Sequence, residues 1–288
     1  MPTFRYATIG GGSSNAIFSY GYYGAIAGGA TNTVTGFNYG TINGGSGNYV
    51  SGYMSTIGGG VSNTARGSWS TVMAGTNNVV NGTYSVAAGG STNVVNPGDA
   101  SAIISSAESA IKGDNSVVVG GRSNMINGDA SSIRGGEGGR IVGDYSSITG
   151  GMDNTVIGDM AAIMGGVSNR AGDYGVVNGG EGNTAGPYAA VLGGKANRAT
   201  GDASFIGGGR ANSAGGVGAV VGGGSRNTAA NDYDTITGGV DNTATGEATF
   251  INGGMGNFIE DSVAATILGG SYNTASESGC VSANQSLA

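Results

Sequence analysis

The chain repeats one short unit along almost its whole length, and this repetition limits the possible folds more than any other feature. An aliphatic residue that precedes a Gly-Gly pair by two positions marks 18 units in the 288 residues, and 16 of them keep both glycines. Eleven of the 17 spacings between these anchors are 15 residues, and the others are 14, 16 or 17. Such units are too short for helix-turn-helix repeats and too regular for loops. The anchors, each called position i, are Ile9, Ile26, Ile42, Ile57, Val72, Ala87, Ile103, Val118, Ile133, Ile148, Ile163, Val177, Val191, Ile206, Val221, Ile236, Ile251 and Ile267.

Each unit predicts two short strands joined by turns. Its consensus is S-x-I-x-G-G-x-x-N-x-[AVI]-x-G-x-x, with Asn at i+6 in 16 of 18 units and Ile, Val or Ala at i+8 in all 18. The small residue at i−2 and the aliphatic one at i alternate with the period of two of a strand, and i+8 belongs to a second strand. Glycine pairs and Asn favour turns with positive φ, and they interrupt any helix before it can nucleate.

The repeat therefore predicts an all-β fold, a parallel β-solenoid (β-roll) of about 18 coils of ~15 residues. We expect a single repeat domain over residues 1–275 and a degenerate C-terminal cap or tail over residues 276–288. The Asn side chains at i+6 should stack into a ladder in which each amide bonds the next coil. Strand alternation also predicts that position i−3 points outward.

The main strand is apolar on both of its faces. Strands of this kind are usually covered on both faces, and the inward side chains alone would form a thin core. We expect the outward face to be an intersubunit contact, and the alternative is a set of scattered exposed apolar residues. The outward apolar residues at i−1 and i+1 include Val86, Val117, Val176, Phe205, Val220, Phe250, Ile104, Val119, Met164, Leu192 and Leu268.

The composition excludes most familiar enzyme chemistry. The chain has no His, and Cys280 is its single Cys, which removes Ser-His-Asp and Cys-His nucleophiles, histidine or cysteine zinc sites and internal disulfides. We expect no enzymatic activity, no cofactor and no metal. Paired carboxylates across an oligomer groove, as used to hydrolyse glycosidic bonds, are the weakest hypothesis. Because no run of 18 apolar residues occurs, we also expect no membrane insertion.

Two units carry a family resemblance. TIGGGVSNTARGSWS at residues 56–70 and SFIGGGRANSAGGVG at residues 204–218 resemble the head repeats of trimeric autotransporter adhesins, the YadA-like left-handed β-roll. They are also similar to Gly-rich repeat arrays of bacteriophage tail-fibre proteins. The resemblance covers roughly residues 5–275 and implies a homotrimer of parallel β-rolls that is displayed on a cell or virion surface and binds another surface.

The chain also departs from a complete autotransporter. It lacks sustained heptads for a coiled-coil stalk, a membrane-anchor barrel and a signal peptide. A fibre segment or a virion protein released by lysis fits these departures better. We therefore expect an extracellular or virion-surface location, with other virion or fibre proteins as further partners.

Charge is unevenly distributed along the chain. Residues 1–98 contain two Arg and no Asp or Glu, and all 18 acidic residues follow them. The acidic remainder argues against nucleic acid as a partner, because nucleic-acid binding needs a basic footprint. Arg140, Arg170 and Arg198 share position i+7, where a solvated mixed face is favoured over a phosphate-binding track because carboxylates lie nearby in the sequence.

A column of aromatic residues is the main candidate binding site. Aromatic side chains combine a large ring with hydroxyl groups, which suits contacts with sugars, and the alternative is that stacked rings only stabilise neighbouring coils. Position i−3 is aromatic in nine units: Tyr6, Tyr23, Tyr39, Trp69, Tyr84, Tyr145, Tyr174, Tyr188 and Tyr233. The segment without acidic residues provides the ligand-binding candidates Tyr6, Tyr23, Tyr39, Trp69 and Tyr84, with Tyr20, Tyr22, Phe37, Tyr49 and Tyr53 nearby.

A second column is acidic. Carboxylates stacked at coil spacing would repel each other, so a cation such as calcium could bridge them. The Gly-Asp pairs here follow GGxxN, unlike the GGxGxD repeat of calcium-binding β-rolls, and solvated turns are favoured. The column contains Asp114, Asp129, Asp144, Asp159, Asp202, Asp232 and Glu247.

These patterns together favour a structural and receptor-binding fibre or adhesin protein that binds a surface glycan or partner through repeated outward side chains. The alternative is a purely structural subunit that forms filaments or decorates a virion without its own receptor binding. Ice binding is a third hypothesis, weakened because the i−1 threonines at 41, 56 and 71 give way to Val86, Ala102 and Val117.

Overall fold

A computed structural model describes residues 6–18, 23–36, 39–276 and 280–281. These residues form strands and turns and contain no helix, which confirms the all-β prediction. They divide into two compact units, unit 1 (Met1–Tyr145) and unit 2 (Ser146–Ala288). The single domain expected over residues 1–275 stays a prediction. The expected tail over residues 276–288 lies, apart from residues 276, 280 and 281, outside the described residues.

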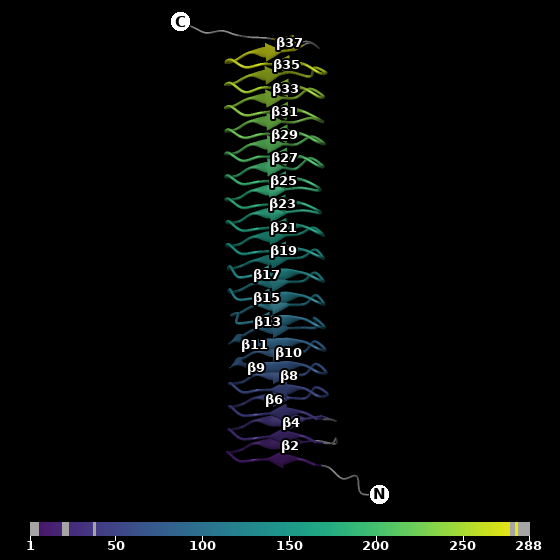
Figure 1. Ribbon diagram of the computed structural model, residues 1–288, viewed down its shortest axis with the longest axis vertical. Helices are drawn as coiled ribbons and strands as arrows, with labels where there is room; N and C mark the ends of the chain where they lie inside the picture. Colours follow the sequence, from purple (N-terminus) through teal and green to yellow (C-terminus); the bar gives the residue numbers. More distant parts are fainter. Residues whose placement is uncertain (1–5, 19–22, 37–38, 277–279, 282–288) are drawn as a thin grey trace. The chain divides into compact units, whose positions relative to one another are not determined.

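Unit 1 is a stack of coils, each with one odd-numbered and one even-numbered strand (Figure 1). Its odd sheet contains β1 (Thr8–Ile9), β3 (Ala25–Ile26), β5 (Thr41–Ile42), β7 (Thr56–Ile57), β9 (Thr71–Thr76), β11 (Val86–Ser91), β13 (Ala102–Ile104), β15 (Val117–Val119) and β17 (Ser132–Arg134). Its even sheet contains β2 (Ala16–Phe18), β4 (Thr33–Thr35), β6 (Tyr49–Val50), β8 (Thr64–Ala65), β10 (Val79–Val80), β12 (Val94–Val95), β14 (Ala110–Ile111), β16 (Met125–Ile126) and β18 (Arg140–Ile141).

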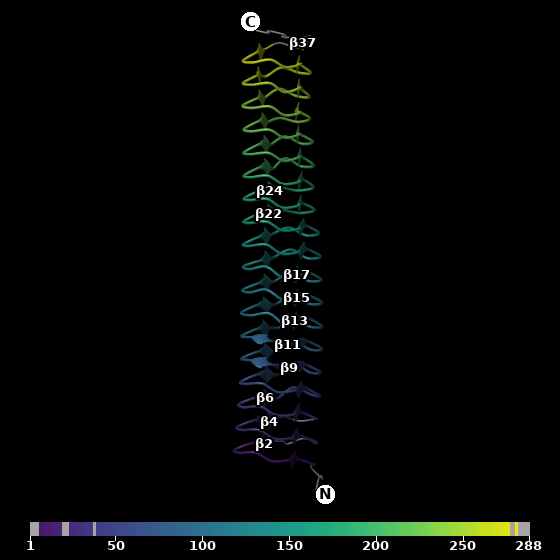
Figure 2. The same cartoon turned by 60° about the vertical axis from the view of Figure 1, so that its left-hand side comes forward.

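Unit 2 has the same plan, and Figure 2 shows its two columns of strands on opposite sides of the coils. Its odd sheet contains β19 (Ser147–Ile148), β21 (Ala162–Ile163), β23 (Val176–Val177), β25 (Ala190–Val191), β27 (Phe205–Ile206), β29 (Val220–Val221), β31 (Thr235–Ile236), β33 (Phe250–Ile251), β35 (Thr266–Ile267) and β37 (Cys280–Val281). Its even sheet contains β20 (Thr155–Val156), β22 (Arg170–Ala171), β24 (Thr184–Ala185), β26 (Arg198–Ala199), β28 (Ser213–Ala214), β30 (Thr228–Ala229), β32 (Thr243–Ala244), β34 (Phe258–Ile259) and β36 (Thr274–Ala275).

Within each unit, every strand pairs in parallel with the equivalent strand of the next coil. The register follows the repeat, so that Ile57 pairs with Val72 in the odd sheet and Val80 pairs with Val95 in the even sheet. This pairing confirms the parallel β-solenoid. The described residues make about 17 coils, close to the 18 expected from the repeat count.

The interior of each coil holds the two apolar positions that the pattern predicts. Anchors such as Ile57 in unit 1 and Ile206 in unit 2 are completely buried, and so are the i+8 residues Ala65 and Ala214. The small or polar residues at i−2 and i+6 are buried beside them. Each coil therefore has a narrow core with a row of small or polar residues along each side.

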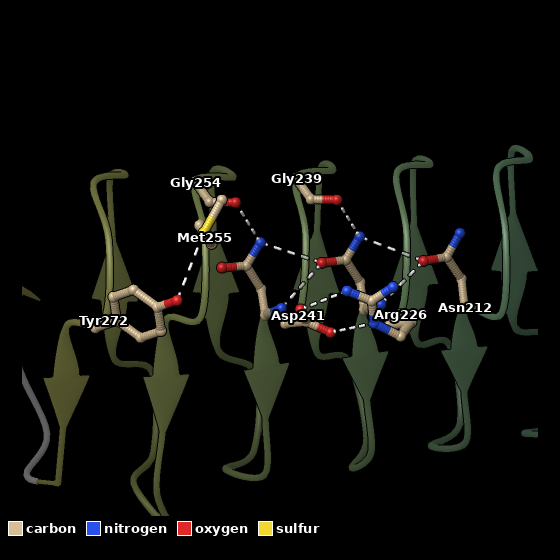
Figure 3. A network of polar contacts seen from close by, with 9 residues as sticks. Asn212, Arg226, Gly239, Asp241, Gly254, Met255 and Tyr272 are labelled. Atoms are coloured by element: carbon tan, nitrogen blue, oxygen red, sulfur yellow. Dashed lines mark hydrogen bonds and ion pairs between the residues drawn. The ribbon is translucent and has the colours of Figure 1, made fainter.

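The Asn row at i+6 forms the expected ladder. Asn212 Nδ2 donates to the carbonyl of Gly208 in its own coil and to that of Gly224 in the next coil, at 2.9 and 3.0 Å. Its Oδ1 accepts the backbone N–H of Asn227 at 3.0 Å. Figure 3 shows this ladder through unit 2, with Asn212 and the glycine carbonyls that accept from the following rungs. One side chain thus satisfies three backbone groups of the turns.

A second ladder follows position i−2. Ser85 Oγ donates to the carbonyl of Gly98 in the next coil at 2.6 Å and accepts the N–H of Ser101 at 3.1 Å. The same pattern continues through Ser101 and Ser116. Small polar residues recur at i−2 because the hydroxyl reaches the next coil without filling the narrow core.

The second glycine of the pair is needed where the Asn ladder passes. Gly60 has φ of 94°, a conformation that favours glycine. A Cβ at this position would collide with the carbonyl oxygen of Gly75 and lie 2.6 Å from Asn63 Nδ2. The pattern GGxxN therefore encodes one structural device, a glycine turn closed by the asparagine amide.

Candidate binding surface

Six aromatic rings follow one another along one edge of unit 1. We call them the aromatic column, which consists of Tyr6, Tyr23, Tyr39, Tyr53, Trp69 and Tyr84. All five predicted binding residues belong to it, and each of these five is between 41% and 61% exposed. The structure therefore brings the whole predicted set into one row.

The rings contact each other in sequence from coil to coil. The centroids of Tyr6 and Tyr23 are 5.1 Å apart, and those of Tyr23 and Tyr39 are 5.0 Å apart, with interplanar angles of 14° and 11°. Trp69 stacks on Tyr84 at 4.9 Å and 9°. These separations match the ~4.8 Å spacing of adjacent strands, so the coil repeat sets the stack.

Tyr53 completes the column and was not among the predicted site residues. The unit anchored at Ile57 has Met54 at i−3, and Tyr53, one residue earlier, takes the place of the missing ring. Its ring meets Tyr39 edge-on at 6.2 Å and Trp69 edge-on at 5.1 Å. The signal for Tyr53 was its position next to the single non-aromatic i−3 residue of the first six units.

Position i−3 is exposed, as predicted, but strand alternation is the wrong reason for it. Position i−3 lies in a turn beyond the strand, where Tyr39, Trp69 and Tyr84 have left-handed φ values of 48°, 53° and 57°. Large residues in this region cost about 1–3 kcal/mol each. Because Ala100 and Asn115 take the same conformation, the turn imposes it and the rings tolerate it.

Stacking decides which part of each ring a ligand can reach. A ring between two parallel neighbours has both faces covered, whereas its edge and its hydroxyl group remain open. Aromatic edges carry partial positive charge and hydroxyls both donate and accept hydrogen bonds. Only Tyr23 has a parallel neighbour on both faces, so it offers its edge and hydroxyl, whereas Tyr6 and Tyr84 at the two ends of the column are each stacked on one face.

The other aromatic residues noted nearby have different positions. Tyr20, Tyr22 and Phe37 lie outside the described residues. Tyr49 lies on the outward side of β6, where its hydroxyl is 2.8 Å from Thr35 Oγ1 and its ring is 5.8 Å from the Arg66 guanidinium. Tyr49 is therefore part of the even sheet and not of the aromatic column.

The odd sheet has the outward apolar face that the sequence predicts. Its i−1 residues, such as Val117 and Phe205, are half-buried, and its i+1 residues are more open. Ile104 and Val119 are 39% and 41% exposed, and Leu192 is 47% exposed. In unit 2, none of the described odd-sheet residues at i−1 and i+1 is charged.

The acidic column caps turns. Asp114 Oδ1 accepts the backbone N–H of Asp99 at 2.8 Å, and Asp129 Oδ1 accepts that of Asp114 at 2.7 Å. In unit 2, Asp232 Oδ1 accepts the N–H of Val217 at 2.8 Å. Each of these carboxylates thus binds a peptide group of the preceding coil, which offsets part of the repulsion along the column.

Exposed ion pairs connect neighbouring coils at the turn after the glycine pair. Arg122 binds Glu108 with two nitrogens at 3.0 and 3.1 Å, and its guanidinium lowers the pKa of that carboxyl below its ordinary value. Arg226 lowers the pKa of Asp241 in the same way, by hydrogen bonds of 2.6 and 2.7 Å (Figure 3). These pairs add little stability because they are exposed.

Unit 2 carries shallow polar hollows at its acidic turns. One hollow, of about 340 Å³, is lined by Asn231, Asp232 and Glu247 among small residues. Within the described ranges, no three acidic or cysteine side chains gather closely enough to hold a metal ion. In the same part of the chain, no helix could cross a membrane.

Comparisons with known proteins assign no relative to this chain. No protein-family model matches it, and no curated protein is significantly similar to it. The likeness to adhesin heads and tail-fibre arrays therefore rests on the repeat pattern, and it stays a prediction.

Proposed function

We propose that this protein is a structural, receptor-binding component of a fibre on a virion or cell surface, and that its aromatic column binds a surface glycan or partner. The column carries the proposal, because it is a continuous row of rings, five of them exposed and Tyr53 half-buried. A rigid solenoid suits such a role, since each coil places the next ring without a flexible loop.

The chemistry of the column favours a linear, hydroxyl-rich ligand. Ring edges attract oxygen lone pairs, and each tyrosine hydroxyl can donate to and accept from a sugar hydroxyl. A chain lying along the column would meet one ring for each ~4.8 Å of its length. Residues 1–98 contain no Asp or Glu, so no carboxylate of that segment would repel an acidic sugar.

Repetition would supply the affinity. Each edge or hydroxyl contact is weak, but linked weak sites can together exceed one site by ~10²–10⁴. The uncharged odd-sheet face of unit 2 supports a homotrimer, in which three columns act together. Sedimentation or native mass measurement should then give three times 27.8 kDa, and a stable folded monomer in dilute buffer would contradict the trimer.

A purely structural subunit is the second candidate, and the covered ring faces favour it. Stacked aromatic pairs contribute about 0.5–1.5 kcal/mol beyond their buried area. In that case, the aromatic column would stabilise the turns of unit 1, and losing its rings would lower stability without affecting any ligand.

Binding of the intact protein to a glycan array and to whole bacterial or eukaryotic cells tests the proposal. A variant with Tyr39→Ser, Trp69→Ser and Tyr84→Ser should lose most of its binding, because it leaves no two rings in contact beyond Tyr6 and Tyr23. The matched control carries Tyr174→Ser, Tyr188→Ser and Tyr233→Ser in unit 2, where Tyr174 and Tyr188 stack at 4.6 Å. This control should keep its binding.

Circular dichroism and mass measurement establish that both variants are folded and have the same oligomeric state. Unchanged binding by the folded unit 1 variant would reject the aromatic column as the receptor site. Reduced stability with no ligand found for the native protein would favour the purely structural role.

A further inference from the structure

Charge is segregated on the outside of unit 2. This unit has twelve acidic and five basic residues and is therefore acidic as a whole. The outward residues of its even sheet from β20 to β32 nevertheless contain no carboxylate, and two of them are arginines. The acidic residues of this stretch lie in the turns or, in the case of Asp234, in the interior. An acidic unit thus presents one sheet face that is basic.

The basic face is built from a single register of side chains. Each even strand places its first residue outward and its second residue in the core, and parallel pairing aligns the outward residues in a row. We call this row the hydroxyl row, because all of its members except the two arginines carry a hydroxyl group. It consists of Thr155, Arg170, Thr184, Arg198, Ser213, Thr228 and Thr243.

The two arginines are available to a ligand. Both side chains are exposed, and in the part of the chain that the structure describes neither forms an ion pair. Of the three other basic groups of unit 2, Lys195 lies 2.8 Å from Glu181 and Arg226 binds Asp241, while Arg210 is exposed but lies outside the row. Arg170 and Arg198 therefore keep the full positive charge of the face.

The distance between the two arginines sets the distance between negative charges that a ligand should have. They are two coils apart, which is about 9.6 Å at the usual strand separation, with Thr184 between them. The residues two positions after Arg170 and Thr184 are Gly172 and Gly186, so these two positions have no side chain next to the row. The site is a strip with two positive charges that one threonine separates, and hydroxyl residues continue the row on both sides.

We propose that the hydroxyl row of unit 2 binds a linear acidic polysaccharide. Guanidinium groups bind carboxylates with paired, charge-assisted hydrogen bonds, and the threonine and serine hydroxyls match the neutral sugar hydroxyls between the charges. A glycan with one carboxylate for each disaccharide has the charge spacing that the arginines require.

Nucleic acid fits this row less well. Its phosphates recur every ~3.4 Å along a strand, about three times as densely as the arginines. Single strands are also held by bases that stack on aromatic side chains, and the outward even-sheet residues from β20 to β32 include none. Unit 1, taken by itself, shows the same bias, with Arg140 in β18, Arg66 and Lys112 directly after β8 and β14, and no carboxylate among the described outward residues of these strands.

The test is calorimetric titration of the full chain with hyaluronan oligosaccharides, which carry one carboxylate for each disaccharide, at two salt concentrations. The Arg170→Gln, Arg198→Gln variant should bind at least tenfold more weakly, and binding by the native chain should weaken as salt rises. The matched control, Arg210→Gln with Arg226→Gln, removes the same charge from the turns and should change the affinity less than twofold. Thr184→Val should weaken binding by a smaller factor, about threefold, because it removes one neutral hydrogen bond.

This site is independent of the proposed role of the aromatic column, and the variants separate the two. The Tyr39, Trp69 and Tyr84 serine variant should keep its affinity for hyaluronan, and a loss there would overturn the hydroxyl row as the site. Equal weakening by the two arginine pairs, or no binding by the native chain, would also overturn it. Tighter, arginine-dependent binding of a twelve-nucleotide single-stranded DNA would assign the row to nucleic acid instead.

Discussion

Units 1 and 2 share one coil plan but keep different polar ladders. In unit 1 serine occupies every i−2 position from Ser55 to Ser131, although Ser70 Oγ donates to Ser55 Oγ and not to a carbonyl, whereas the asparagine row is interrupted by Ser109 and Gly139. In unit 2 the asparagine ladder is unbroken from Asn154 to Asn273, and the serine positions are often alanine or glycine. The described residues of each unit therefore hold one continuous ladder and one broken ladder.

This difference shows what the coil requires. Apart from a register shift after Ala87 between β9 and β11, both units keep the same parallel register, so neither ladder alone sets the fold. An interior asparagine has two amide hydrogens and donates to carbonyls of two coils at once, whereas a serine has one hydroxyl hydrogen, so Ser85 donates to the carbonyl of Gly98 or of Thr83. We infer that removing a rung matters most where that ladder is continuous and the other is broken.

The largest effect is expected for Asn212→Ala in unit 2. It leaves the N–H of Asn227 and the carbonyl of Gly208 without their partner, while the carbonyl of Gly224 keeps the N–H of Arg210, and it should cost about 2–3 kcal/mol in the free energy of unfolding. Equilibrium unfolding in urea measures this cost. Asn81→Ala in unit 1 is the control, because Asn81 Oδ1 is buried without a hydrogen-bond partner, and its loss should cost less than about 1 kcal/mol. Equal costs would show that the ladder adds nothing.

A smaller effect is expected for Ser85→Ala in unit 1. The change leaves the carbonyl of Gly98 and the N–H of Ser101 unpaired and should cost about 1–1.5 kcal/mol. Ser204→Ala in unit 2 is the comparison, because Ser204 lies between Ala189 and Ala219 and donates within its own coil to Gly201 at 2.7 Å. It should cost less than Ser85→Ala, and the reverse order would contradict the two-ladder comparison.

Placing an asparagine where the ladder of unit 1 lacks one should increase the stability of the fold. Gly139→Asn restores asparagine at i+6, where Asn124 Oδ1 already accepts the N–H of residue 139 at 2.9 Å. The new amide can donate to the carbonyl of Gly135, and the unfolded chain loses glycine freedom. Because the new Cβ would lie 2.9 Å from Asn124 Oδ1, that amide must shift, and the net gain should be about 0.5 kcal/mol. A thermal melt measures it. Destabilisation would mean that the narrow core of unit 1 has no room for the rung.

The smallest effect concerns the exposed pair Arg122 and Glu108 in unit 1. Because Arg122 lowers the pKa of Glu108 in the folded state, the pair stabilises the fold above the ordinary pKa of glutamate. This contribution disappears as the pH falls through the lowered pKa. Carbon-detected NMR titration should show the pKa of Glu108 rising in Arg122→Gln. An unchanged titration would show that the pair does not persist in solution.

The fold could be predicted because its signal is repeated. A single Gly-Gly or Asn says little about structure. Asn recurs at i+6 in 16 of 18 units, and this recurrence predicts a side chain that forms hydrogen bonds with adjacent coils. The same repetition located the buried pair at i and i+8. The five predicted ring residues fell in one row for the same reason, because equal spacing along the chain becomes one column in a solenoid.

The details of the turns could not be predicted in the same way. Strands here are mostly two residues long, so alternation does not extend to i−3, and the left-handed turn at Trp69 had no sequence marker. Tyr53 was missed because it enters the aromatic column from a different position of the repeat. Likewise, the caps formed by Asp114 and Asp129 depend on the geometry between coils, which a consensus of one unit does not contain.

The fluorescence of Trp69 tests the proposed function most directly. It is the only tryptophan of the chain, and it stacks on Tyr84 at one end of the proposed site. Titrating the intact protein with the glycan that binds best on the array should change the intensity and wavelength of its emission, with the same midpoint as binding measured by calorimetry. Emission that stays constant while calorimetry reports binding would place the ligand elsewhere and contradict the aromatic column as the receptor site.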